Sequence, residues 1–312
     1  MYSYIKTIND IKNCFENNTI CKRDDNGNTL YLYCCKMGYL KCIEYIDARI
    51  QVRNDINQTI HKTINTGKPR IQSENLKCYY MYKNKSEENN YLLAARYGHL
   101  EILKYLDESP GLTNRYAVNK SGMDAYLLAA SEGHVEIMKY FEQTNVKSMY
   151  WSVNITNICD EGTYLVATTY GHVNVMKYLE NKKCDIYIKN RDGNNAFHLA
   201  VLNSKYDVLK HLTDTFNYNI NVLNKLHQNP YILAVIDDNT DMVKYLETEF
   251  HCFFNYLDES VKKATKSQIM LPVQKCYCGM CPKPCIEYDS VYSHLKQKKN
   301  ILIKYWKKKN IV

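Results

Sequence analysis

The chain has 312 residues, of which 45% are hydrophobic and 24% charged, the balance of a folded, water-soluble protein. Its first residues contain no apolar signal-peptide core and no stretch approaches 18 apolar residues, so we expect an intracellular protein that is neither secreted nor membrane-spanning. The net charge of +8 is uneven, because residues 261–312 hold 12 lysines and two acidic residues.

Residues 1–20 are predicted to form an N-terminal capping helix. Apolar residues recur in this segment at Ile5, Ile8, Ile11 and Phe15. The first copy in a stack of repeats has an apolar face that such a helix covers.

Residues 21–250 repeat one phrase, most clearly in 94–106 and 129–141, about 35 residues apart. The second half of the phrase has apolar residues at its first, second and fifth places, the pattern of an amphipathic helix. Its six copies are 42–46, 102–106, 137–141, 175–179, 208–212 and 242–246. Ahead of each copy we predict a shorter helix ending near a small pair, at 34–35, 94–95, 129–130, 167–168, 200–201 and 234–235.

A turn is predicted three residues after each small pair. Glycine stands there at 38, 98, 133 and 171, where a helix end commonly needs a left-handed residue. Ser204 and Asp238 take the place in the last two copies, so those turns should be less relaxed. Replacing Gly133 with valine should cost about 1 kcal/mol or more.

The first two copies lie 60 residues apart, which leaves 47–88 unexplained. The segment is either a polar insertion or a degenerate repeat around residues 59–67. Both interpretations stay open at the level of the sequence.

The opening of the fifth copy, Asp192-Gly193-Asn194-Asn195-Ala196-Phe197-His198-Leu199-Ala200-Val201, resembles the ankyrin repeat, with Asn195 for the usual threonine and Ala196 for proline. Residues 25–30 open the first copy in the same manner. The resemblance implies an all-α ankyrin-repeat solenoid of stacked helix–turn–helix units over about 21–250, followed by a cap and basic Cys-rich tail at 251–312. The threonine and histidine of the opening are mostly lost, so we expect their usual hydrogen bonds to be absent in most copies.

The resemblance also implies a non-enzymatic scaffold that binds a protein partner through its concave face. Charged and aromatic residues carry most interface energy, and the predicted contacts are Arg96, Tyr97, Glu132, Tyr170, Arg191 and Asp192. The wording of the repeats looks like that of ankyrin families from giant amoeba-infecting DNA viruses, which implies a host protein as partner and the cytoplasm of an infected cell as compartment. We expect a monomer.

The recurrent histidines at 99, 134 and 172 occupy one fixed place in the repeat. We interpret them as structural residues at a helix start and not as a metal or acid–base centre.

A possible structural zinc site lies in 276–294. Cys278 and Cys281 followed by His294 have three of the ligand spacings of a C2H2 finger, and Cys276 or Cys285 could complete a tetrahedral set. The alternative is a loop of free thiols. No cofactor other than this metal is expected.

Residues 296–309 combine lysines with Tyr305 and Trp306, which could contact nucleic-acid phosphates and bases. The alternative function is therefore nucleic-acid binding through the basic Cys-rich tail. The resemblance to poxvirus ankyrin proteins implies a further alternative, recruitment of a ubiquitin ligase through the same tail. The plainer interpretation is a solvent-exposed helix whose apolar residues cap or pack on the preceding Cys-rich segment.

Overall fold

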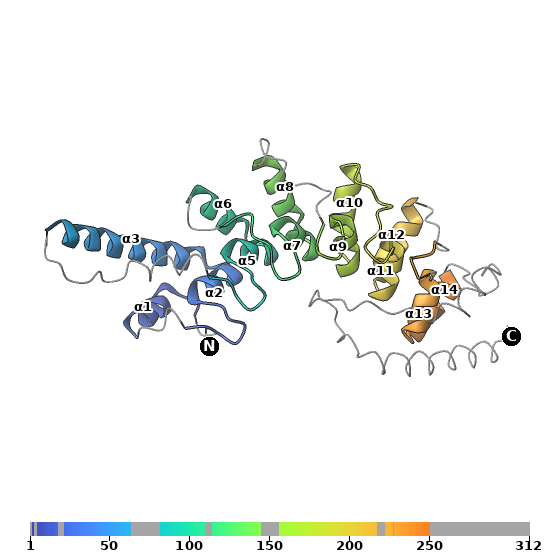
Figure 1. Cartoon of the computed structure of the whole chain (residues 1–312), viewed down its shortest axis with the longest axis horizontal. Coiled ribbons are helices and arrows are strands. Elements are labelled where there is room, and N and C mark those ends of the chain that lie inside the picture. Colours follow the sequence, from blue (N-terminus) through green and yellow to red (C-terminus); the bar gives the residue numbers. More distant parts are fainter. Residues whose placement is uncertain are drawn as a thin grey trace. The chain divides into compact units, whose positions relative to one another are not determined.

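The computed structural model describes residues 2, 5–17, 22–63, 82–109, 114–144, 156–216, 222–226 and 228–249, with backbone alone for 52–63 (Figure 1). The chain divides into two compact units, 1–152 and 153–312, each considered by itself. Within the described ranges the regular structure is helical, apart from one isolated bridge between Thr156 and Gly162.

The helices form the six pairs that the repeated phrase predicts. The first helices are α2 (Leu30–Met37), α5 (Asn90–Arg96), α7 (Ala125–Ser131), α9 (Thr163–Tyr170), α11 (Ala196–Leu202) and α13 (Pro230–Ile236). The second helices are α3 (Leu40–Thr63), α6 (Leu100–Glu108), α8 (Val135–Thr144), α10 (Val173–Asn181), α12 (Tyr206–Phe216) and α14 (Thr240–Glu249). The predicted all-α repeat architecture is therefore confirmed.

First helices of successive pairs pack against one another, α2 on α5 and α5 on α7 in one unit, α9 on α11 and α11 on α13 in the other. The small pairs make this close approach possible: Ala94, Ala95, Ala129 and Ala130 are all fully buried. Each second helix buries the first, second and fifth residues of its phrase, such as Ile102, Leu103 and Leu106 of α6. Burial of these residues from both sides gives one continuous core in each unit.

Helix α1 (Ile8–Glu16) begins later than the predicted capping segment, because Thr7 and Asp10 form a capping box that sets its first turn. It packs against α3 and buries Ile11 and Cys14, while Ile5 is buried ahead of the helix. No disulfide joins any of the described cysteines, which are Cys14, Cys34, Cys35, Cys42, Cys159 and Cys184.

Helix α3 continues through the first part of the unexplained segment, to Thr63. The pairs on either side of the segment are nevertheless direct neighbours, because α2 packs on α5 and the Lys85 N–H donates to the Asn26 carbonyl over 3.0 Å. This direct packing favours an insertion over a degenerate repeat at 47–88.

The start of each first helix corrects one expectation. Side chains of Thr29, Asn89, Asp124, Asn195 and Asn229 each accept the backbone N–H three residues on. The prediction that this hydrogen bond is absent in most copies is wrong, since Asn and Asp cap a helix as well as threonine does. Only Gly162, at the start of α9, supplies no side-chain cap among these six helices.

The turns follow the prediction. Gly38, Gly98, Gly133 and Gly171 have φ between 78° and 93°. Ser204 and Asp238 adopt φ of 54° and 56° in the last two copies, a region in which side chains are strained.

Candidate interaction surface

A loop precedes each first helix, and one Asp or Asn organises it. In the second copy the Asn84 Oδ1 accepts the N–H groups of Ser86 and Glu88, both at 2.9 Å. The Asn84 N–H in turn donates to the Glu88 carbonyl over 3.0 Å. The same backbone bond recurs at Asp24, Asn119, Asn157, Asn190 and Asn224. The side chain therefore fixes a five-residue loop in one shape, repeat after repeat.

Neighbouring loops are joined within each unit. The Lys120 N–H donates to the Ser86 carbonyl over 3.0 Å in the first unit, and the Lys225 N–H donates to the Asp192 carbonyl over the same distance in the second. These hydrogen bonds order the loops in the free protein. A partner that binds the loops therefore does not lose affinity to the conformational entropy of ordering them.

In the first unit the repeated histidine ties its turn to the preceding repeat. His99 Nε2 donates to the Lys36 carbonyl over 2.8 Å, and His134 Nε2 donates to the Arg96 carbonyl over 2.9 Å. These carbonyls lie at the ends of α2 and α5, where helix acceptors need external donors. His99 and His134 therefore act as structural caps, in agreement with the sequence interpretation.

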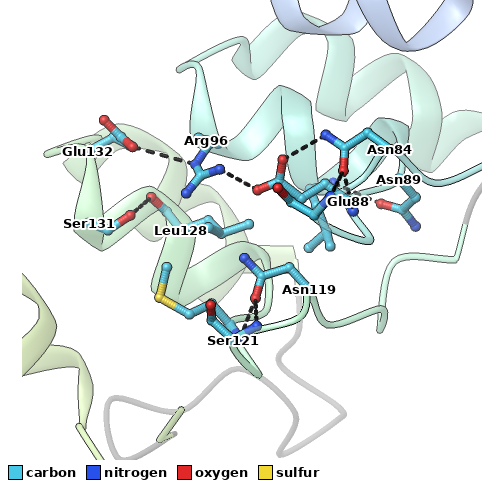
Figure 2. A network of polar contacts seen from close by, with 12 residues as sticks. Asn84, Glu88, Asn89, Arg96, Asn119, Ser121, Leu128, Ser131 and Glu132 are labelled. Carbon is cyan, nitrogen blue, oxygen red and sulfur yellow. Dashed lines mark hydrogen bonds and ion pairs between the residues drawn. The ribbon is translucent and has the colours of Figure 1, made fainter. Parts of the chain in front are cut away.

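Three of the predicted contact residues lie where first helices end: Arg96 and Tyr97 at the end of α5, and Glu132 at the end of α7. Figure 2 shows Arg96 between two carboxylates, those of Glu88 and Glu132. Its guanidinium pairs with Glu88 through Nη1 and with Glu132 through Nε at 3.5 Å. The Glu88 side chain is only 3% exposed and also accepts a hydrogen bond from Asn84. Arg96 thus neutralises a buried charge, a structural role that the sequence did not indicate.

Tyr97 stands next to this ion pair and is 41% exposed. The Lys36 Nζ of the neighbouring repeat lies 5.1 Å from its ring centroid, within range of a cation–π contact. Met37, at the place of Tyr97 in the first copy, is 40% exposed and was not among the predicted contacts. We call Lys36, Met37, Arg96, Tyr97 and Glu132 the turn patch.

Tyr170, Arg191 and Asp192 belong to the second unit. Tyr170 ends α9 and is half-buried. Arg191 and Asp192 are exposed at a loop tip, where the Arg191 Nε lies 3.4 Å from the Asp160 Oδ2. Exposed ion pairs of this kind contribute little to stability. The exposed side chains of Arg191 and Asp192 are therefore available to a partner.

The proposed zinc ligands, Cys276, Cys278, Cys281, Cys285 and His294, lie outside the described residues. Within the part that the structure describes, no group of three or more His, Cys, Asp or Glu side chains could hold a metal ion. None of the described helices is both long and apolar enough to cross a bilayer.

A family model described as ankyrin repeats (3 copies) matches residues 91–190 and 164–258. Together these ranges cover more than half of the chain. No curated protein matches the chain.

Proposed function

The chain belongs to the ankyrin-repeat family, and from that premise we propose that it binds a protein partner through the turn patch and the adjoining loops of its first unit. Ankyrin repeats are generally protein-interaction modules, and the family is typically non-enzymatic. The observation that carries the proposal is the exposed Tyr97, which lies within cation–π range of Lys36 and follows Arg96, whose ion pair with Glu88 joins the turn to a preordered loop.

The patch combines the side chains that anchor interfaces. A rigid aromatic ring and a flexible methionine offer apolar area, while Lys36 and Glu132 offer charges at the border. Arg96 stabilises the fold under the patch, because removing its side chain would leave the buried Glu88 carboxylate without its ion-pair partner. A test of binding must therefore alter Tyr97 or Met37 and leave Arg96 intact.

The experiment is affinity capture of partners by the intact chain, followed by titration of the captured protein against variants. Tyr97→Ala and Met37→Ala should each weaken binding, by about tenfold or more for Tyr97. Lys104→Ala is the control, because Lys104 lies on α6, in the second helix of the same repeat. Unchanged affinity in both patch variants, with native circular dichroism, would refute the proposal.

The finer predictions rest on resemblance and on residues outside the described ranges. A host protein as partner, a viral origin, a cytoplasmic compartment and a monomeric state stay predictions. So do zinc binding in 276–294 and nucleic-acid or ubiquitin-ligase recruitment through the tail. Metal analysis of the full chain, with Cys278→Ser and Cys281→Ser as controls, tests the first of these tail properties.

A further inference from the structure

The loops that precede the first helices of the first unit carry a row of exposed basic side chains. They are Lys22, Arg23, Lys83, Lys85 and Lys120. We call these five residues the basic row. The exposed acidic residues of the same loops, which span 22–29, 82–89 and 114–124, are Asp25 and Glu87. Five positive and two negative charges give the exposed side chains of the loops a net charge of +3.

The other charged side chains of these loops serve the fold. Asp24 accepts two backbone N–H groups of its own loop, and Asp124 caps α7. The rest form ion pairs within the unit, Glu88 with Arg96 and Arg115 with Asp107. The basic row therefore dominates the charge that these loops present to a partner.

Backbone contacts fix the positions of Lys85 and Lys120. Each lysine directly follows the residue that organises its loop, and its N–H donates over 3.0 Å to a carbonyl of the preceding loop. The stem of Lys85 also packs over Gly27, where a Cβ would lie 3.1 Å from the Lys85 Cγ. The Arg23 Nη1 donates to the Lys83 carbonyl over 3.1 Å, which joins the first two loops at a second point. The basic row is thus ordered along its backbone, and its charged ends are exposed.

The second helices of the same unit carry the opposite charge. Residues 40–51, 100–108 and 135–144 contain seven acidic and four basic side chains, a net charge of −3. Two of these bases, Lys104 and Lys139, form ion pairs with Glu101 and Glu136 over 2.8 and 2.7 Å. A segregation of charge of this kind orients a charged partner before contact, because the loops attract an anionic segment and the second helices repel it.

We infer that the basic row binds an acidic segment of the protein partner, rich in Asp and Glu, and guides this segment to the turn patch. The inference rests on the proposed function, and the ion pair of Glu88 with Arg96 connects the second loop to the turn patch. An exposed ion pair contributes little to affinity once it has formed. The basic row therefore acts mainly on the rate of association, whereas Tyr97 acts on the rate of dissociation.

A protein carboxylate fits the basic row better than a nucleic-acid backbone does. Asp25 stands in the first loop at the place that Lys85 and Lys120 occupy in the next two loops, and Glu87 follows Lys85 by two residues. A nucleic acid carries a phosphate at every nucleotide and would bring negative charge against these carboxylates. A protein segment can place neutral or basic residues opposite them.

The first test mixes the full-length chain with a polyglutamate peptide and joins contacting carboxylates and lysines with a carbodiimide. Mass spectrometry then measures each lysine separately, so links to the lysines of 261–312 do not interfere. Lys85 and Lys120 should link about tenfold more often than Lys41, which is exposed on α3 among the acidic second helices. Equal yields at the three lysines contradict the inference. So does unlabelled oligothymidine that suppresses the links more effectively than unlabelled polyglutamate, a result that assigns the basic row to nucleic acid.

The second test measures the binding kinetics of the captured partner. Lys85→Glu with Lys120→Glu should lower the association rate constant about tenfold at low salt and leave dissociation nearly unchanged. Lys41→Glu with Arg49→Glu is the matched control, because it reverses two exposed charges on α3. Unchanged association in the folded double variant, or an equal loss in the control, overturns the inference. Tyr97→Ala should instead speed dissociation, so a failure of the turn patch is distinguishable from a failure of the basic row.

Discussion

Replacing Asp124 with asparagine should stabilise the protein at neutral pH. Asp124 caps α7, and burial raises the pKa of its carboxyl from 3.8 to about 6. A shift of about two units corresponds to a penalty of roughly 3 kcal/mol for the ionised folded state at pH 7. This net shift already includes the backbone N–H groups at the helix start, which favour the anion and lower the pKa. Asparagine keeps the acceptor for the Leu127 N–H without the charge, so we expect a gain of about 1–3 kcal/mol.

The raised pKa of Asp124 also predicts how the effect of the substitution changes with pH. Between pH 4 and 6 the folded state holds a proton that the unfolded chain has lost, so the penalty develops as pH rises through this window. The advantage of Asp124→Asn should therefore be about half as large at pH 5 as at pH 7. Urea denaturation of both proteins at the two pH values, followed by circular dichroism, measures it.

Asn229 provides the mirror-image control. It caps α13 by accepting the Ile232 N–H at 2.8 Å and is nearly buried. Asn229→Asp should lose stability at pH 7 and recover part of it at pH 5. A neutral or destabilising Asp124→Asn at pH 7, or a gain that does not change with pH, would show that the carboxylate is not penalised by burial.

The other predictions concern a buried histidine and two turns. Burial lowers the pKa of His198 to about 4, so the folded state keeps the neutral imidazole that donates to the Gln228 carbonyl, while the unfolded chain binds a proton below about pH 6.5. Stability is therefore lost as pH falls from 6.5 to 4. Acidification to pH 5 should therefore cost the wild type about 2 kcal/mol more than His198→Gln, as shown by urea titration of both proteins. Gly98 has φ of 83°, and a Cβ there would lie 2.8 Å from the His134 ring. Gly98→Ala should cost about 2–3 kcal/mol in the wild type and about 1 kcal/mol in a His134→Ala background, and equal costs in a double-mutant cycle contradict the contact. Asp238→Gly should raise stability by about 0.5–1 kcal/mol by relieving positive φ, and a lower melting temperature argues against strain at this turn.

Some recurring features could have been found in the sequence. The Asp or Asn at 24, 84, 119, 157, 190 and 224 is a periodic signal of the loop, yet it is visible only once the loop ends are aligned. A tyrosine followed 16 residues later by a carboxylate recurs in every copy but the fifth, which has Phe197 and Thr213 at these places. The spacing did not predict the second hydrogen bond of these carboxylates, because the donor, such as the Tyr140 hydroxyl that bonds Asp107, belongs to the next repeat.

The candidate site was predicted less completely than the fold. Arg96 was expected to face a partner, but it pairs with Glu88, a carboxylate that only the folded chain buries beside it. Met37 was not among the predicted contacts, because these were chosen among charged and aromatic residues. The exposure of a side chain depends on which residues pack around it in the folded chain.

The repeated phrase alone determined the six helical pairs, their buried faces and their glycine turns, because helical periodicity and backbone sterics act over a few residues. The tertiary structure decided what the polar side chains do. His134 reaches a carbonyl 38 residues back, and Tyr140 reaches a carboxylate 33 residues back. Such partners are set by how one repeat packs on the next, which no single copy of the phrase encodes.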